Sequence, residues 1–148
     1  MLFRSLARQA GDQYFALFAG LFLARLKLLM GQIAEGIADY RAVLETSNAL
    51  DLRVGIAIGL EYFGEVAIWS GDVPRAVRLG ATAARIKEEL GGGIAGRMGG
   101  ALEPLVFGRE QLSAVEFDRE VAAGRAMDIE TAIEEALATP EPTMVPSR

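Results

Sequence analysis

The feature of this sequence that most restricts its fold is a duplication with a spacing of 40 residues. Gly31 in the first copy matches Gly71 in the second, and apolar residues recur on both sides of these glycines. The matching residues are Phe22–Ala24 with Tyr62–Gly64 before the glycines, and Ile33 with Val73 and Ile37 with Val77 after them. Each copy is therefore predicted to be a helix, a tight glycine turn and a second helix, and two helices joined by so short a turn lie antiparallel.

The composition predicts helix along the rest of the chain as well. Ala, Leu, Glu and Arg are abundant, only five prolines occur, and no long run alternates apolar and polar residues with a period of two. The expected helices cover approximately residues 2–10, 13–29, 33–46, 52–70, 74–90, 103–107, 112–123 and 129–138. Gly11 and Asp12 are expected to end the first of these, and Asp51 and Asp128 are expected to be N-caps.

The chain divides into four parts by composition. Residues 1–90 carry the helical repeats, and residues 91–101 form a glycine-rich linker. Residues 102–138 form a C-terminal helical cap, and residues 139–148 form a proline-containing tail. Because stacked hairpins bury their apolar faces only against neighbours, the uncovered first end predicts either a homodimer or contact with an upstream domain.

The spacing within each copy resembles the tetratricopeptide (TPR) pattern. Small residues occupy matching positions of the paired helices, and these are Ala24, Gly64, Gly36 and Ala76. Tyr40 has the size to fill the gap between successive hairpins, whereas Gly80 replaces it in the second copy. The repeat is longer than the usual 34 residues, and Lys27 stands where the pattern has an aromatic residue. The resemblance implies an all-α protein, an α-solenoid of antiparallel, TPR-like helix hairpins with a small C-terminal helical cap.

A second resemblance covers about residues 13–137. Residues 123–127 (Ala-Gly-Arg-Ala-Met) and the following Ile129–Ile133 resemble the C-terminal region of bacterial ATPase-containing LuxR-type transcriptional regulators and cyclase-linked ATPases. The resemblance implies a sensor arm that follows a P-loop ATPase domain. This chain has no G-x-x-x-x-G-K-[S/T] stretch, so the nucleotide and DNA functions of those proteins transfer to none of its residues.

The residue types that are missing exclude several kinds of chemistry. The chain has no cysteine and no histidine, which rules out disulfides, Cys/His zinc sites and Ser-His-Asp or Cys-His nucleophiles. A net charge of −5 argues against nucleic-acid binding. The apolar run from Tyr14 to Ala24 is about half the length of a membrane-spanning helix, so a buried helix is expected. The missing cysteines fit a reducing compartment, and a cytoplasmic protein is expected. No catalytic, cofactor-binding or metal-binding residue is predicted.

Three charged residues are predicted to bind the partner. Glu61 and Glu65 lie four residues apart on one helical face, and Arg25 belongs to the corresponding helix of the first hairpin. We expect them to be exposed on a concave surface that binds a protein or a small effector. Two alternatives stay open, a ligand-binding sensor with its ligand between the hairpins, and a carboxylate-based enzyme that uses Glu61 and Glu65.

Two further patterns have plainer interpretations. The glycines of residues 91–96 fit G-x-G-x-x-G, but no strand precedes them, so a hinge is expected. A basic side on the fourth helix is explained by pairing within the helix, to Glu88 and Glu89. Its members are Arg75, Arg78, Arg85 and Lys87.

Overall fold

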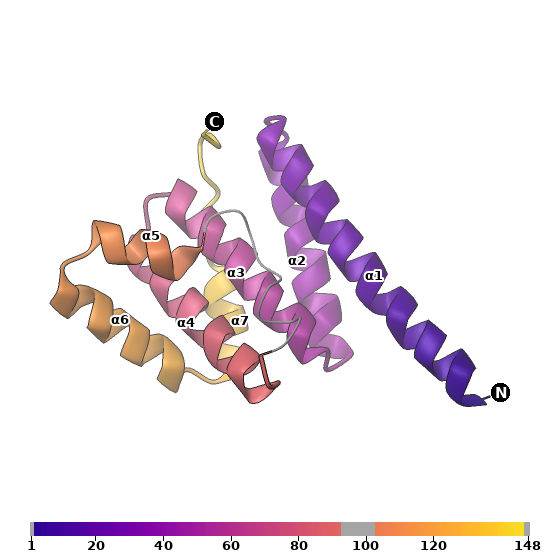
Figure 1. Ribbon diagram of the computed structural model, residues 1–148. Coiled ribbons are helices and arrows are strands. Elements are labelled where there is room, and N and C mark those ends of the chain that lie inside the picture. The colour runs from indigo at the N-terminus through magenta and orange to yellow at the C-terminus, as the bar shows by residue number, and fades with distance from the viewer. Residues whose placement is uncertain (1, 93–102, 147–148) are drawn as a thin grey trace.

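The computed structural model describes residues 2–92 and 103–146, and these contain seven helices and no strand. The helices are α1 (Leu2–Leu29), α2 (Ile33–Ala49), α3 (Arg53–Trp69), α4 (Val73–Glu89), α5 (Pro104–Gln111), α6 (Ala114–Ala126) and α7 (Ile129–Leu137). The all-α prediction is confirmed. As Figure 1 shows, α1 and α2 lie together at one side of the molecule, and α5 and α6 lie at the other.

The two predicted glycine turns have the same geometry. Gly31 and Gly71 both have a φ of 84°, a left-handed conformation that glycine adopts without steric cost. The amide of the residue after each glycine donates to a carbonyl five residues back, from Gln32 to Lys27 at 2.9 Å and from Asp72 to Ala67 at 2.8 Å. This is the Schellman arrangement, which satisfies carbonyls that the ending helix leaves open. The turns fold α1 onto α2 and α3 onto α4.

Two predictions of helix ends are wrong. α1 continues through Gly11 and Asp12, because an exposed glycine lowers helix stability by only about 1 kcal/mol and the residues around it favour helix. Asp51 is not the N-cap of α3, since it has a φ of 52° and follows the end of α2, while Leu52 occupies the N-cap position. Asp128 does cap α7, where its side chain accepts from the Thr131 amide at 2.7 Å.

A small residue permits close packing inside the first hairpin, as predicted. A Cβ atom on Gly36 would lie 2.6 Å from Cγ of Leu28 and 2.8 Å from the carbonyl oxygen of Ala24. Between the hairpins, the buried ring of Tyr40 meets the rings of Tyr62 and Phe63 edge to face, with centroids 5.0 and 6.1 Å apart. Tyr40 therefore fills the space between α2 and α3, which is the position that its spacing predicts.

The C-terminal helices pack on the second hairpin. α5 lies over α4 with Pro104 against Gly64 and Gly80, so a proline ring occupies the space that Gly80 leaves open. α6 packs on α4, and α7 packs on α3 and α4. Gly91 and Gly92 end α4 with φ values of 90° and 74°, while residues 93–101 of the predicted linker lie outside the described residues.

Candidate functional site

The three residues predicted to bind a partner form ion pairs within the chain. Nε of Arg25 donates to Oε1 of Glu65 at 3.0 Å, and Nζ of Lys87 donates to Oε1 of Glu61 at 2.6 Å. The Glu65 side chain is fully buried and the Arg25 side chain is 23% exposed, while Glu61 is partly buried. The expectation that these residues are exposed is wrong, because the neighbouring helices bring a cation to each carboxylate. A role in partner binding stays a prediction.

Burial dominates the electrostatics of this region. It raises the pKa of Glu61, and the hydrogen bond from Lys87 offsets only part of that rise. Burial also raises the pKa values of Tyr40 and Tyr62, and the negative charge of Glu65 raises both further. Within residues 2–92 and 103–146, no three acidic side chains come close enough to hold a metal ion. Through their ion pairs, Glu65 joins α3 to α1 and Glu61 joins α3 to α4.

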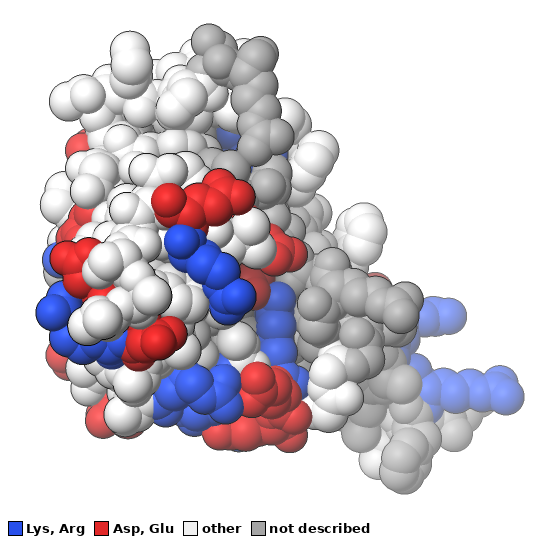
Figure 2. Space-filling model, turned by 60° about the vertical axis from the view of Figure 1, so that its left-hand side comes forward, with Lys and Arg blue, Asp and Glu red and all other residues white. Residues whose placement is uncertain are grey.

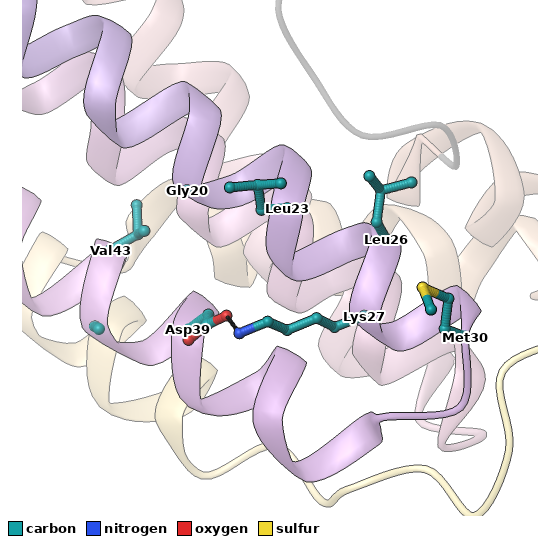
Figure 3. Close-up of a pocket in the computed structure, with 8 residues that line it drawn as sticks. Gly20, Leu23, Leu26, Lys27, Met30, Asp39 and Val43 are labelled. Carbon is teal, nitrogen blue, oxygen red and sulfur yellow. Dashed lines mark hydrogen bonds and ion pairs between the residues drawn. The ribbon is translucent and has the colours of Figure 1, made fainter.

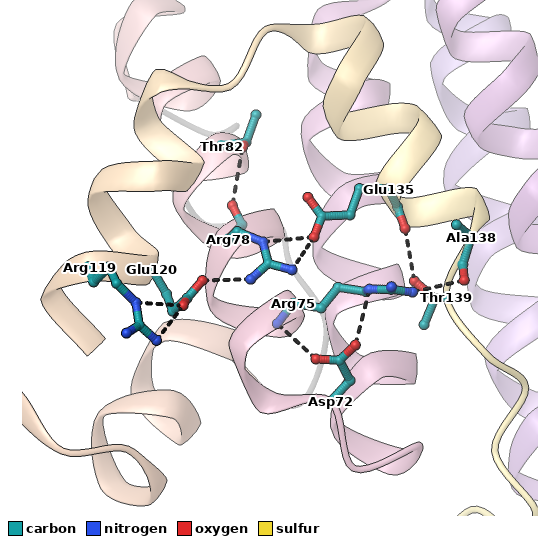
Figure 4. A network of polar contacts seen from close by, with 9 residues as sticks. All are labelled: Asp72, Arg75, Arg78, Thr82, Arg119, Glu120, Glu135, Ala138 and Thr139. Atoms are coloured by element: carbon teal, nitrogen blue, oxygen red, sulfur yellow. Dashed lines mark hydrogen bonds and ion pairs between the residues drawn. The ribbon is translucent and has the colours of Figure 1, made fainter. Parts of the chain in front are cut away.

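The basic residues of α4 make most of their polar contacts with other helices and not within α4. Arg78 donates to Glu120 of α6 at 2.5 Å and to Glu135 of α7, and Figure 4 shows its guanidinium between these two carboxylates. Arg75 donates to the Ala138 carbonyl at 2.8 Å. Of the expected pairs to Glu88 and Glu89, the described residues show Arg85 with Glu89, and Arg75 pairs with the N-cap residue Asp72 at 3.2 Å. The explanation from pairing to Glu88 and Glu89 is therefore wrong for Arg78, whose partners lie on other helices. These contacts attach α6 and α7 to the second hairpin.

The surface on that side has charges of both signs side by side. Figure 2 shows acidic and basic side chains next to one another on the face that carries the C-terminal helices. The pairs include Arg125 with Glu88 at 2.7 Å and Arg119 with Glu120 at 3.0 Å. Because these neighbouring charges largely neutralise one another, the described residues of this face form no extended patch of one sign.

The outward side of α1 has the opposite character. We call the outer face of α1 the surface formed by Phe15, Ala19, Phe22, Leu23, Leu26, Leu29 and Met30. Phe15 is 76% exposed, Phe22 is 60% exposed and Met30 is 74% exposed. The opposite side of the same helix is buried against the rest of the protein. Exposed apolar surface of this extent is uncommon on monomeric proteins, so the outer face of α1 is a candidate interaction site.

A groove opens between α1 and α2 beside this face. Its volume is about 520 Å³. Its lining, drawn in Figure 3, consists of Gly20, Leu23, Leu26, Lys27, Met30, Asp39, Ala42 and Val43. Lys27 and Asp39 form an ion pair of 2.5 Å across it, and that hydrogen bond raises the pKa of Lys27. The other lining residues are apolar, so the groove suits an apolar ligand or side chain.

Sequence reasoning interpreted this part of α1 as a buried helix and missed the surface. The available signal was that Tyr14–Ala24 is apolar all round, whereas a helix on the surface of a protein is apolar on one side only. That pattern shows that both sides of α1 suit burial. It does not show which side the rest of the chain covers.

No family model, curated protein or solved structure matches this chain. None of the helices in the described part of the chain has the length and hydropathy that a bilayer crossing requires. The surfaces described above are therefore the basis for a functional conclusion.

Proposed function

We propose that this chain is a non-catalytic, TPR-like interaction module that binds a helix on the surface formed by α1 and α2. The observation that carries the proposal is the outer face of α1 together with the apolar groove beside it. The proposal includes a cytoplasmic location, and a relationship to the sensor arm of bacterial LuxR-type regulators and cyclase-linked ATPases.

Three features support a TPR-like arrangement. The same Schellman turn closes both hairpins, and Gly36 allows close packing of the first. Tyr40 fills the space between the hairpins, as a repeat stacked on its neighbour requires. On the other side of the second hairpin, α5 lies over Gly80, the counterpart of Tyr40.

A helix is the ligand that best suits this surface. Grooves between helices accept amphipathic helices whose apolar side chains recur every three or four residues. The groove is open and apolar, and the ion pair between Lys27 and Asp39 across it offers one polar contact. The surface thus combines a large apolar area with a charged contact, a combination that is common in protein interfaces.

A small apolar effector is the second candidate. The groove volume of about 520 Å³ lies within the range of ligand pockets. Its polar groups do not converge on one point, however, because Lys27 and Asp39 bind each other. Native mass spectrometry of the purified chain tests this candidate, since a resident ligand adds a fixed mass that Leu23→Glu removes.

The proposal is tested by affinity capture from a lysate of the source organism. Leu23 is exposed and lines the groove, so Leu23→Glu places a charge on the binding surface without disturbing the core. Val115 is more exposed and belongs to α6, so Val115→Glu is the matched control. We expect capture by the wild type and the control and at least a tenfold loss with Leu23→Glu. Equal capture by all three proteins contradicts the proposal, and so does capture by none when the chain itself is monomeric in solution.

A further inference from the structure

Among the helices in the described part of the chain, α1 has the most exposed large apolar residues. The inner side of α1 is buried through Leu17, Leu21, Ala24 and Leu28. The outer side is apolar as well, from Phe15 to Met30. A helix that is apolar all round is normally buried on both sides. The state in which α1 functions therefore includes something that covers its outer face.

The second hairpin shows what such a face accepts. Residues 40 positions later, on α3, are Gly55, Gly59 and Tyr62, and these correspond to Phe15, Ala19 and Phe22. The α3 residues pack on α2. A Cβ atom on Gly55 would meet Ser47 and one on Gly59 would meet Leu44, while the Tyr62 ring contacts Tyr40. The corresponding face of α1 therefore has the position and spacing of a surface that another helix covers.

We propose that the covering helix is α1 of a second copy of this chain, paired antiparallel about a two-fold axis at Phe22. The inference rests on the interaction surface proposed above and names its partner. α2 of the second copy is unavailable, because its corresponding face packs on its own α3. Among the described helices, α1 is the one whose outer face is apolar and uncovered.

The outer face complements itself in this arrangement. Phe15, Ala19, Phe22, Leu26 and Leu29 follow one another at spacings of four, three, four and three residues, the pattern of paired helices. Phe22 lies midway along this row. Antiparallel pairing about it sets Phe15 opposite Leu29 of the other copy and Ala19 opposite Leu26, so that a small residue meets a large one.

The area is sufficient for a stable dimer. From their exposed fractions, the six large residues of the outer face expose about 700 Å² per copy, taking roughly 200 Å² for each when fully accessible. Two copies together would bury about 1,400 Å², within the range of specific interfaces and above that of most crystal contacts.

The charges permit the pairing. Between Phe15 and Met30 the charged residues are Arg25 and Lys27, and each is neutralised within its own chain, by Glu65 and Asp39 respectively. Dimerisation through this span therefore leaves no cation newly buried without a partner, which would otherwise weaken the interface.

Sedimentation velocity of the purified chain over the micromolar range tests the dimer. We expect the wild type and Val115→Glu to sediment as dimers and Phe22→Glu to sediment as a monomer, with the same far-ultraviolet circular dichroism per residue. A wild type that stays monomeric throughout overturns the inference, and so does a Phe22→Glu variant that remains dimeric. A monomeric wild type leaves the proposed function to the capture experiment, so the two failures can be told apart.

Cysteine cross-linking tests the register and direction. The chain has no cysteine, so an introduced one reports only its own contacts. A disulfide requires Cα atoms within about 7 Å of each other. Phe22→Cys should therefore link to itself, whereas Phe15→Cys and Leu29→Cys should link to each other when mixed and not to themselves. Efficient self-linking of Phe15→Cys indicates parallel helices and overturns the proposed geometry.

Discussion

The close approach of α1 and α2 at Gly36 can be tested with a single methyl group. In Gly36→Ala the new Cβ would lie 2.6 Å from Cγ of Leu28 and 2.8 Å from the Ala24 carbonyl oxygen. The Leu28 side chain can move, but the carbonyl belongs to the backbone of α1, so the helices must separate. Overpacking lowers the free energy of unfolding by about 1–3 kcal/mol, and the higher helix propensity of alanine raises it by about 0.5–1 kcal/mol. We expect a net loss of about 1–2 kcal/mol in the free energy of unfolding.

Gly11→Ala is the matched control. Gly11 is also inside a helix, but a Cβ atom there would have nothing within 4 Å. The same substitution should therefore stabilise the protein by up to about 1 kcal/mol. Urea unfolding followed by circular dichroism, at one protein concentration, measures both variants. For a chain of this length, Gly36→Ala should lower Tm by about 2–8 °C. If Gly36→Ala is as stable as the wild type, α1 and α2 are not packed as closely as described.

Four other residues give predictions of their own. The Ser47 hydroxyl is buried and has no hydrogen-bond partner in the described part of the chain, so Ser47→Ala should raise the free energy of unfolding by about 1 kcal/mol. Arg25→Met removes a cation from the buried Glu65 and should cost about 2–3 kcal/mol in urea unfolding, whereas a purely partner-binding Arg25 would leave stability unchanged. Burial raises the pKa of Glu61 above its ordinary 4.5, so its ionisation opposes folding, and Glu61→Gln should become more stable relative to the wild type as pH rises from 4.5 toward neutrality. Glu120 has the opposite sign, since its hydrogen bonds to arginines outweigh burial and lower its pKa, so the stability lost in Glu120→Gln should shrink as the pH falls below 4.5. A pH dependence of the same sign in both variants contradicts the assignment.

Local signals in the sequence predicted the turns. Gly31 and Gly71 need a left-handed φ that few other residues adopt, and each stands between two helical apolar patterns. The requirement is a property of single residues, so it is visible without the fold. Asp51 shows the limit, because it adopts a left-handed conformation at a helix end where its residue type predicted an N-cap.

The candidate site was less predictable, because it depends on which helices meet. The spacing of Glu61 and Glu65 shows that they share a face, but only the fold brings Lys87 and Arg25 to them. For Arg78, the sequence suggested Glu88 and Glu89 of its own helix as partners, whereas the fold provides Glu120 and Glu135 from helices far along the chain. Exposure of a charged residue cannot be read from the sequence when its partner is distant.

The position of α5 sets a limit on assembly. A further hairpin stacked on α4 would need the space above Gly80, where Pro104 already lies. α6 also packs on α4. The association proposed above would join the outer face of α1 to the same face of a second copy. Such a contact closes at two subunits, whereas joining one end to the other would let chains add without limit. Because α5 and α6 cover α4, the proposed contact through α1 favours a closed dimer over an open filament.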